Sequence, residues 1–257
     1  NRYPSASHQD LRETLSKIYA LPSSRIFAGH GSDEAIDLLM RAFCTPAKHT
    51  ILSLAPSYGM YKVSAKINDI GYHEVQLNQD FTLDIDAVLN TISPSTRIIF
   101  ICSPNNPTGN TFSREQIEAL LQVYDGLVVV DEAYIDFAIE HSVLALHHNY
   151  FNLIILRTFS KAWGLAGLRL GTAIAHPAVI NVLYAIKPPY NLNNPTLDVG
   201  KQLLQMKAEV QASVARLVQE RKRMEVALLR FDCVQHVYPS EANFLLVKVT
   251  DAQRVYT

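Results

Sequence analysis

The sequence predicts an α/β fold in which helices cover both faces of a mostly parallel sheet. Short apolar, β-branched runs alternate with amphipathic helical stretches along most of the chain. The runs are almost continuously apolar, as is typical of strands that are buried on both faces of a parallel sheet. The length of 257 residues allows one large domain and a smaller second one.

Six apolar runs are candidates for the strands of this sheet. They are Thr50–Leu54, Tyr72–Leu77, Arg97–Cys102, Leu127–Val130, Asn152–Leu156 and Gly171–Ala175. In open α/β sheets, ligands bind beyond the carboxyl ends of the strands. We therefore expect the residues that carry chemistry to follow these runs directly.

Helical patterns separate the runs and then lead into a second domain. The helix candidates between the strands are Asp33–Phe43, Tyr58–Asn68, Arg114–Tyr124 and Ala178–Ile186. A longer pattern, Pro195–Phe231, is too long for a simple crossover and predicts passage into another domain. Strands of that domain are expected at Val234–Tyr238 and Asn243–Val249. We therefore expect a large domain at 1–200 and a small domain at 201–257.

Composition excludes several classes of function. The formal charge is −1, which argues against a nucleic-acid surface. Cys44, Cys102 and Cys233 lie far apart without a CxxC pair, so we expect neither disulfides nor a metal site, and a reducing, cytoplasmic compartment. No apolar run approaches the roughly 18 residues of a membrane span. The start resembles no signal peptide. Because the sequence begins with Asn1 rather than methionine, we expect it to be part of a longer chain.

The most informative window places Ser160, Lys161 and, eight residues further on, Arg169 after an apolar run. A lysine charge is poorly placed directly after a buried strand. It is well placed if the amine is used covalently, as a Schiff base that substrate can reach. Ser160 and Arg169 supply a hydroxyl and a guanidinium, which suit phosphate oxygens. The alternative is a surface lysine in an ordinary loop.

A glycine-rich motif, GHGSDE at residues 29–34, precedes the first helix candidate. Gly31 permits a tight turn, Ser32 can cap the helix, and the free N–H groups at its start can bind an anion. A plain helix cap explains the motif equally well. His30 is interpreted as a turn residue.

The motif SPNNPTG, residues 103–109, follows the third strand candidate. Its two prolines fix the backbone, and the amides of Asn105 and Asn106 can donate to a phenolate oxygen. An ordinary turn is the alternative, since Asn, Pro and Gly dominate turns.

The motif DEAY places Asp131 at the end of a buried strand, where an ionised carboxylate needs a partner. A protonated ring nitrogen is one such partner, and the pairing makes a pyridine ring an electron sink. Mg²⁺ is the rival partner for Asp131 and Glu132, but the sequence lacks a GxxxxGK[ST] phosphate loop. Tyr134 can supply a phenol to the same ligand.

The motif PSYGMY, residues 56–61, follows the first strand candidate. An aromatic side chain such as Tyr58 can stack on a planar ring at this position. Aromatic residues in loops are also commonly just packed, so this motif only supports the others.

Taken in order, these motifs resemble the fold-type I pyridoxal-phosphate aminotransferases, and most closely the histidinol-phosphate aminotransferase family. The likeness extends from NRYP at residues 1–4 to PSEANF at residues 239–244. SPNNPTG and DEAY are common to many aminotransferases. NRYP, GSDE, RAFC at residues 41–44, PSYGMY and SKAWGLAGLRLG are more specific to this family. The resemblance implies pyridoxal 5′-phosphate as the cofactor, bound by a large domain and covered by a small α+β domain.

The resemblance also implies which residues hold the ring of the cofactor. Lys161 is expected to bind it covalently, and Asp131 is expected to pair with the pyridine nitrogen. Tyr58 is expected to stack on the ring, while Asn106 and Tyr134 hold its 3′-oxygen.

The remaining implied residues bind the phosphate and the substrate. The phosphate ligands are expected to be the backbone amides of Ser32 and Asp33 and the side chains of Ser160 and Arg169. Tyr3 matches a tyrosine that reaches the phosphate of a neighbouring subunit in this family, so a homodimer is implied. Asn243 matches a substrate-side asparagine.

The implied reaction is the reversible transfer of an amino group between histidinol phosphate with 2-oxoglutarate and imidazole acetol phosphate with glutamate, in L-histidine biosynthesis. An aromatic aminotransferase or a threonine-phosphate decarboxylase would use the same cofactor residues. A non-catalytic regulator domain that binds pyridoxal phosphate would also retain Lys161. Such regulators usually carry a helix-turn-helix segment before this domain, and no such segment is seen in this sequence.

Members of the family continue beyond the position of Thr257, with small-domain arginines that grip the acidic end of the substrate. We therefore expect residues 201–257 to be an incomplete small domain. A polypeptide that ends at Thr257 is expected to take up the cofactor but to transaminate histidinol phosphate poorly.

Overall fold

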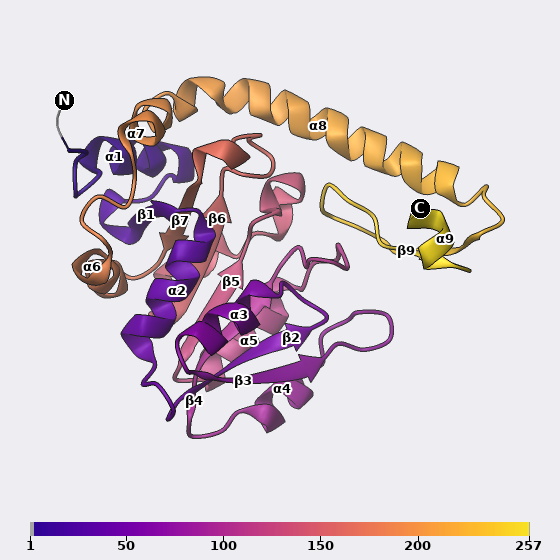
Figure 1. Cartoon of the computed structure of the whole chain (residues 1–257), viewed down its shortest axis with the longest axis horizontal. Coiled ribbons are helices and arrows are strands. Elements are labelled where there is room, and N and C mark those ends of the chain that lie inside the picture. The colour runs from indigo at the N-terminus through magenta and orange to yellow at the C-terminus, as the bar shows by residue number, and fades with distance from the viewer. Residues whose placement is uncertain (1–2, 257) are drawn as a thin grey trace.

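The computed structural model describes residues 3–256 (Figure 1). Asn1, Arg2 and Thr257 lie outside the described residues, and with them the first half of the NRYP motif. Seven strands form one sheet in the order β1–β7–β6–β5–β4–β2–β3. The strands are β1 (Ile26–His30), β2 (Thr50–Ala55), β3 (Gly71–Gln76), β4 (Thr96–Cys102), β5 (Leu127–Asp131), β6 (Leu153–Thr158) and β7 (Leu170–Ile174).

The strand directions confirm a mostly parallel sheet. β3, β2, β4, β5 and β6 pair in parallel. Only β7 runs the other way, because it is antiparallel to both β6 and β1. The carboxyl ends of the other strands therefore meet the amino end of β7 at a single edge of the sheet.

The sequence pattern does not predict β1. Its sequence, IFAGH, is short and contains Gly29, and glycine is depleted in strands. The segment is a strand because it pairs along its whole length with β7, from Ile26 opposite Ile174 to His30 opposite Leu170. Such a partner, far away in the sequence, leaves no local signal. The other six strands begin and end within one or two residues of the expected positions.

Helices cover both faces of the sheet, as expected. They are α1 (Gln9–Tyr19), α2 (Ser32–Phe43), α3 (Met60–Ile67), α4 (Ile85–Thr91), α5 (Arg114–Val123) and α6 (Pro177–Ile186). Strand side chains alternate between the two faces. Phe100 and Val129 pack with α2, α3 and α6, whereas Ile99 and Val130 pack with α4 and α5. α1 covers β1 on the second of these faces.

The helical pattern expected over Pro195–Phe231 is interrupted rather than continuous. It forms α7 (Asn194–Gly200) and α8 (Leu203–Leu228). Asn193 caps α7 by accepting the N–H of Thr196, and the helix ends at Gly200, a poor helix former. In Figure 1, α8 extends from α7 across the molecule, away from the large sheet. Within residues 3–256, no helix is both long enough and apolar enough to cross a membrane.

A second, two-stranded sheet follows α8. It pairs β8 (Val234–Val237) with β9 (Val247–Val249), and α9 (Ala252–Tyr256) follows. β9 is shorter than the expected Asn243–Val249, because the preceding segment forms a turn in which Ser240 Oγ donates to the carbonyl of Phe244 at 2.6 Å. This sheet shares no strand with the large one. A domain boundary between residues 200 and 201 stays a prediction.

Candidate active site

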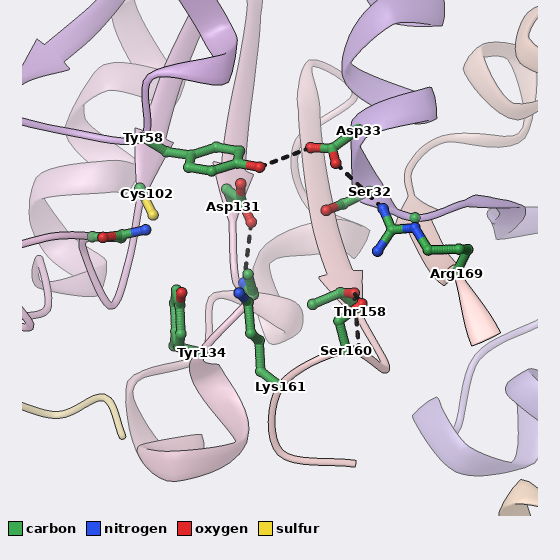
Figure 2. Close-up of a pocket in the computed structure, with 13 residues that line it drawn as sticks. Ser32, Asp33, Tyr58, Cys102, Asp131, Tyr134, Thr158, Ser160, Lys161 and Arg169 are labelled. Atoms are coloured by element: carbon green, nitrogen blue, oxygen red, sulfur yellow. Dashed lines mark hydrogen bonds and ion pairs between the residues drawn. The ribbon is translucent and has the colours of Figure 1, made fainter. Parts of the chain in front are cut away.

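The loops at the carboxyl edge of the large sheet enclose a pocket (Figure 2). Its lining residues are Gly31, Ser32, Asp33, Tyr58, Cys102, Asn106, Asp131, Ala133, Tyr134, Thr158, Ser160, Lys161 and Arg169. They follow β1, β2, β4, β5 and β6, or precede β7, so they come from separate parts of the sequence. Of the residues expected at the site, Tyr3, Asn243 and the alternative candidate Asn105 do not line the pocket, and the others are brought together here.

One end of the pocket can accept an anion. Ser32 and Asp33 begin α2, where backbone N–H groups lack helical partners and the helix dipole is positive. Gly31 precedes them at φ 77°, and a Cβ there would lie 2.7 Å from Nη2 of Arg169. Glycine therefore lets the guanidinium approach the start of the helix. These features together match the common arrangement of phosphate sites.

Two hydroxyl groups lie beside this end of the pocket. Thr158 Oγ1 donates to Ser160 Oγ at 3.0 Å, and the Ser160 backbone N–H donates to Thr158 Oγ1 at 3.2 Å. The pair fixes the turn between β6 and Lys161 (Figure 2). Thr158 lies two residues before the Ser160–Lys161 window, and no role was predicted for it.

Asp131 is buried at the end of β5, with 2% of its surface exposed. Its Oδ2 accepts the Tyr61 hydroxyl at 2.8 Å, and its Oδ1 accepts the Ala133 N–H at 3.1 Å. Burial raises the pKa of Asp131 to about 6, while the hydrogen bonds from Tyr61 and Ala133 and the charge of Lys161 act to lower it. Among the described residues no cation forms an ion pair with this carboxylate. Asp131 therefore suits a cationic ligand atom.

Lys161 follows Ser160 and lies between Tyr134 and the Thr158–Ser160 pair (Figure 2). Its Nζ is 5.2 Å from the centroid of the Tyr134 ring. Backbone hydrogen bonds of 3.0 Å, from Gly164 to the Lys161 carbonyl and from Leu165 to the Phe159 carbonyl, fix the loop that carries it. The side chain is exposed, so a reactant can reach the amine.

Tyr58 borders the pocket between the anion-binding end and Asp131 (Figure 2). Its hydroxyl donates to Asp33 Oδ1 at 3.1 Å, and Asp33 Oδ2 lies 3.5 Å from Arg169 Nη2. Burial and the neighbouring Asp33 raise the pKa of Tyr58, so its hydroxyl stays protonated. The ring packs edge to face on Tyr61, with 5.5 Å between centroids. These contacts fix the ring plane at the wall of the pocket.

The two asparagines of SPNNPTG do different things. Asn105 is fully buried and holds its own loop, since its Nδ2 donates to the Pro56 carbonyl at 2.9 Å and to Thr108 Oγ1 at 2.7 Å. Its amide is therefore not free to bind a ligand. Asn106 lines the pocket and keeps the role that was expected for it as a prediction.

Tyr3 and Asn243 lie outside the pocket. Tyr3 is 80% exposed and stacks on Tyr190, with 4.7 Å between ring centroids. Asn243 is exposed, but the adjacent Phe244 packs edge to face on Tyr134 at 5.1 Å. Their expected roles, in a neighbouring subunit's site and toward the substrate, stay predictions.

Sequence reasoning missed Tyr61, the residue that binds Asp131 most closely. Tyr61 belongs to PSYGMY and follows Tyr58 by three residues, so the two lie about one helical turn apart. The spacing is a usable signal, but only once Tyr58 is known to face the pocket.

The pocket thus offers an anion cradle, an aromatic wall, a buried carboxylate and an exposed amine. This set suits a flat ligand that carries an anionic group, a basic ring nitrogen and a carbonyl that can react with Lys161. Within residues 3–256, no group of three or more histidine, cysteine or acidic side chains is arranged to hold a metal ion.

The sheet, the covering helices and the lysine at the carboxyl edge define the fold of the fold-type I pyridoxal-phosphate enzymes. The family model of class I and II aminotransferases matches residues 1–256. A histidinol-phosphate aminotransferase from Cytophaga hutchinsonii is 46% identical over 256 residues, which are 100% of this chain and 74% of that protein. The chain belongs to the class I and II aminotransferase family.

Solved structures agree with this assignment of the fold. The histidinol-phosphate aminotransferase from Clostridium acetobutylicum matches with a TM-score of 0.92 and 24% identity, over 100% of this chain and 77% of that one. The enzyme of the same name from Sinorhizobium meliloti, solved in complex with pyridoxal-5′-phosphate, matches with a TM-score of 0.89 and 21% identity, over 97% of this chain and 68% of that one.

Proposed function

We propose that this aminotransferase binds pyridoxal 5′-phosphate in the pocket and acts on histidinol phosphate. The observation that carries the cofactor assignment is Asp131, a buried carboxylate that faces the pocket without a cation to pair with among the described residues. A protonated pyridine nitrogen supplies that cation. The relative from Cytophaga hutchinsonii, named a histidinol-phosphate aminotransferase, supports the substrate.

The lining residues fit the cofactor from one end of the pocket to the other. The phosphate would bind at the start of α2, through the N–H groups of Ser32 and Asp33, with Ser160 and Arg169. Because Arg169 already lies 3.5 Å from Asp33, this guanidinium is partly neutralised before any phosphate arrives.

The remaining lining residues would hold the ring. Tyr58 would cover one face, and Asn106 and Tyr134 would hold the 3′-oxygen. Lys161 would bind the cofactor covalently through Nζ. Bound in this way, pyridoxal phosphate supplies a sink for the electrons that remain when a bond at the substrate Cα breaks.

The protein's own groups then have distinct tasks in amino transfer. Asp131 would keep a positive charge at the far end of the ring, and this charge strengthens the electron sink. Once the substrate amine has released it, Lys161 Nζ would accept the proton from the substrate Cα. It would then donate this proton to the cofactor carbon C4′. Buried positions such as that of Asp131 also keep water away from the charges that develop.

Covalent trapping tests the assignment of Lys161. Borohydride reduction of the cofactor-loaded protein should fix the cofactor to the peptide that contains Lys161, and Lys161→Arg should abolish the label. Lys187 serves as the comparison lysine, because it is buried, unlike Lys161, and its Nζ donates to the carbonyls of Pro188 and Pro189 at 3.0 Å. A label on Lys187, or no label, would contradict the proposal.

Substrate choice is tested by comparing amine donors on the same preparation. Histidinol phosphate should be transaminated with 2-oxoglutarate more efficiently than phenylalanine, tyrosine or threonine phosphate. Preference for the aromatic amino acids would indicate an aromatic aminotransferase, and release of CO₂ from threonine phosphate would indicate the decarboxylase. Binding of pyridoxal phosphate without turnover of any donor would indicate a regulator domain. The homodimer and the cytoplasmic location remain part of the proposal.

A further inference from the structure

Within residues 3–256, Tyr61 is the one fully buried tyrosine whose hydroxyl bonds a group of the pocket. It is 0% exposed, and its hydroxyl donates to Asp131 Oδ2 at 2.8 Å. Tyr61 belongs to α3, whereas Asp131 ends β5, so the bond joins the helical layer to the sheet. The role assigned to the pocket so far does not use this hydroxyl.

The geometry of both elements aims these two groups at each other. Side chains alternate along β5, so Asp131 points to the same face as Val129, toward α2 and α3. Tyr61 packs on that face, stacked on Phe100 of β4 with 4.7 Å between centroids and an interplanar angle of 18°. Tyr58 packs on the same ring in an edge-to-face arrangement, with 5.5 Å between centroids. Two aromatic neighbours and the bond to Asp131 thus fix the position of the Tyr61 ring and its hydroxyl.

The Asp131 carboxylate is consequently held at both oxygens. Oδ2 accepts from Tyr61, and Oδ1 accepts from the Ala133 N–H at 3.1 Å. Both donors stabilise the ionised carboxylate, against the cost of burial. Because each carboxylate oxygen can accept more than one hydrogen bond, these contacts leave capacity for a ligand in the pocket.

We propose that Tyr61 is a positioning residue, which orients the Asp131 carboxylate and favours its ionised form before the cofactor binds. This inference rests on the proposed cofactor site. Tyr61 itself is not among the residues that line the pocket. It would therefore act on the ring nitrogen only through Asp131.

The other charged and polar groups around Asp131 either favour its ionised form without a hydrogen bond or oppose that form. The charge of Lys161 favours the ionised carboxylate, whereas the charge of Asp33 opposes it. Cys102, buried on β4, keeps its proton because burial and Asp131 both raise its pKa. Tyr58 is protonated and donates to Asp33. Tyr61 is therefore the only one of the side chains described here that donates a hydrogen bond directly to Asp131.

The test measures thermal stability of the cofactor-free protein against pH, between pH 4 and pH 8. Ionisation of the buried Asp131 destabilises the native state, so stability should fall as the pH rises through the pKa of this carboxylate. In Tyr61→Phe the ionised form loses a donor, so the folded pKa of Asp131 should rise. The fall in stability should then extend to higher pH by about one unit or more, while it begins at the same pH. In the Asp131→Asn variant no carboxyl group titrates at this position. Adding Tyr61→Phe to this variant should therefore not change how its thermal stability depends on pH.

Tyr124→Phe is the matched control. Tyr124 is also a buried tyrosine, but in the described part of the chain its hydroxyl has no hydrogen-bond partner, and the residue does not line the pocket. This variant should keep the wild-type pH profile. If Tyr61→Phe lowers stability equally at every pH, Tyr61 is only structural and the proposal is wrong. If Tyr61→Phe does not fold, titration of the Asp131 carboxyl carbon by NMR in the wild type and in Tyr124→Phe decides instead. A pKa of about 6 or lower without ligand would support the proposal, and a pKa above about 8 would overturn it.

Kinetics then separate positioning from binding. In the cofactor-loaded protein, Tyr61→Phe should lower kcat roughly tenfold and leave KM for the amine donor almost unchanged, since Tyr61 does not line the pocket. An unchanged kcat would contradict the positioning role. Failure of the proposed function would look different: no cofactor would bind in any variant, whereas the titration of the cofactor-free protein would still report on the Tyr61–Asp131 bond.

Discussion

Asp131 occupies the most constrained position in the pocket, a fully buried carboxylate between two hydrogen-bond donors. Burial raises its pKa from the ordinary 3.8 to about 6. An acid whose pKa is higher in the folded state stabilises the protein at low pH, and this contribution is lost as the pH rises through the folded pKa. The same residue that we assign to the cofactor therefore destabilises the cofactor-free protein at neutral pH.

This linkage gives a prediction for Asp131→Asn. Without cofactor, the wild type should lose about 3 kcal/mol of stability between pH 4 and pH 7, whereas the variant should show a flatter profile. Chemical denaturation at several pH values checks this. With cofactor, turnover of the variant should fall roughly 100- to 1,000-fold, as when one donor to a developing charge is removed. If the stability of the variant depends on pH as in the wild type, Asp131 is not the titrating group. If the variant turns over normally, the carboxylate is not needed for catalysis.

At the scale of the elements, the start of α2 packs closely on the backbone of β7 beside the pocket. A Cβ on Gly171 of β7 would collide with the backbone nitrogen of Ser32, the first residue of α2. Gly171→Ala should therefore displace the start of α2 and weaken the binding of phosphate or cofactor. Gly59→Ala is the control, because nothing lies within 4 Å of a Cβ at Gly59. Equilibrium dialysis with inorganic phosphate measures the effect, and equal affinity in both variants would contradict it.

A buried ion pair joins β6 to the residue that follows β5. Arg157 Nη2 lies 2.7 Å from Glu132 Oε2, and Glu132 also accepts from Ser142 and from the Val143 N–H. Glu132 was considered for Mg²⁺ with Asp131, but it is satisfied by these protein groups instead. Arg157→Met should cost roughly 3–5 kcal/mol, because it leaves a buried charge unpaired. Adding Glu132→Gln should recover part of this loss in denaturation experiments, and two additive losses would argue against the pair.

The same elements show what the sequence can and cannot predict. Motifs that follow strands directly, such as those of Asp131 and Lys161, were predicted because parallel strands end at a common edge. β1 was missed because its only cause is pairing with β7, which is remote in the sequence. Tyr61 was missed because its partner depends on how α3 packs on β4 and β5. Local patterns predict elements, whereas contacts between layers need the structure.

At the scale of the whole molecule, α8 carries the chain from the large sheet to the small one. Arg221 of α8 donates through Nη1 to the Ala242 carbonyl at 2.6 Å and pairs with Glu241 at 3.3 Å. The Glu241 N–H donates to the Gly109 carbonyl at 2.7 Å, at the SPNNPTG loop. The segment next to Asn243 is thus tied by a backbone hydrogen bond to the loop that supplies Asn106 to the pocket.

The last prediction concerns Tyr3, which is exposed and lies outside the pocket of its own chain. If two subunits share their sites, Tyr3 completes the phosphate site of the neighbour, and a Tyr3→Phe homodimer has two weakened sites. A Lys161→Ala homodimer has none that can react. Refolding both variants together forms mixed dimers, in which the intact Lys161 site receives an intact Tyr3. Activity at limiting cofactor should then exceed the sum of the separate variants, whereas a simple sum would show that Tyr3 serves no neighbouring site.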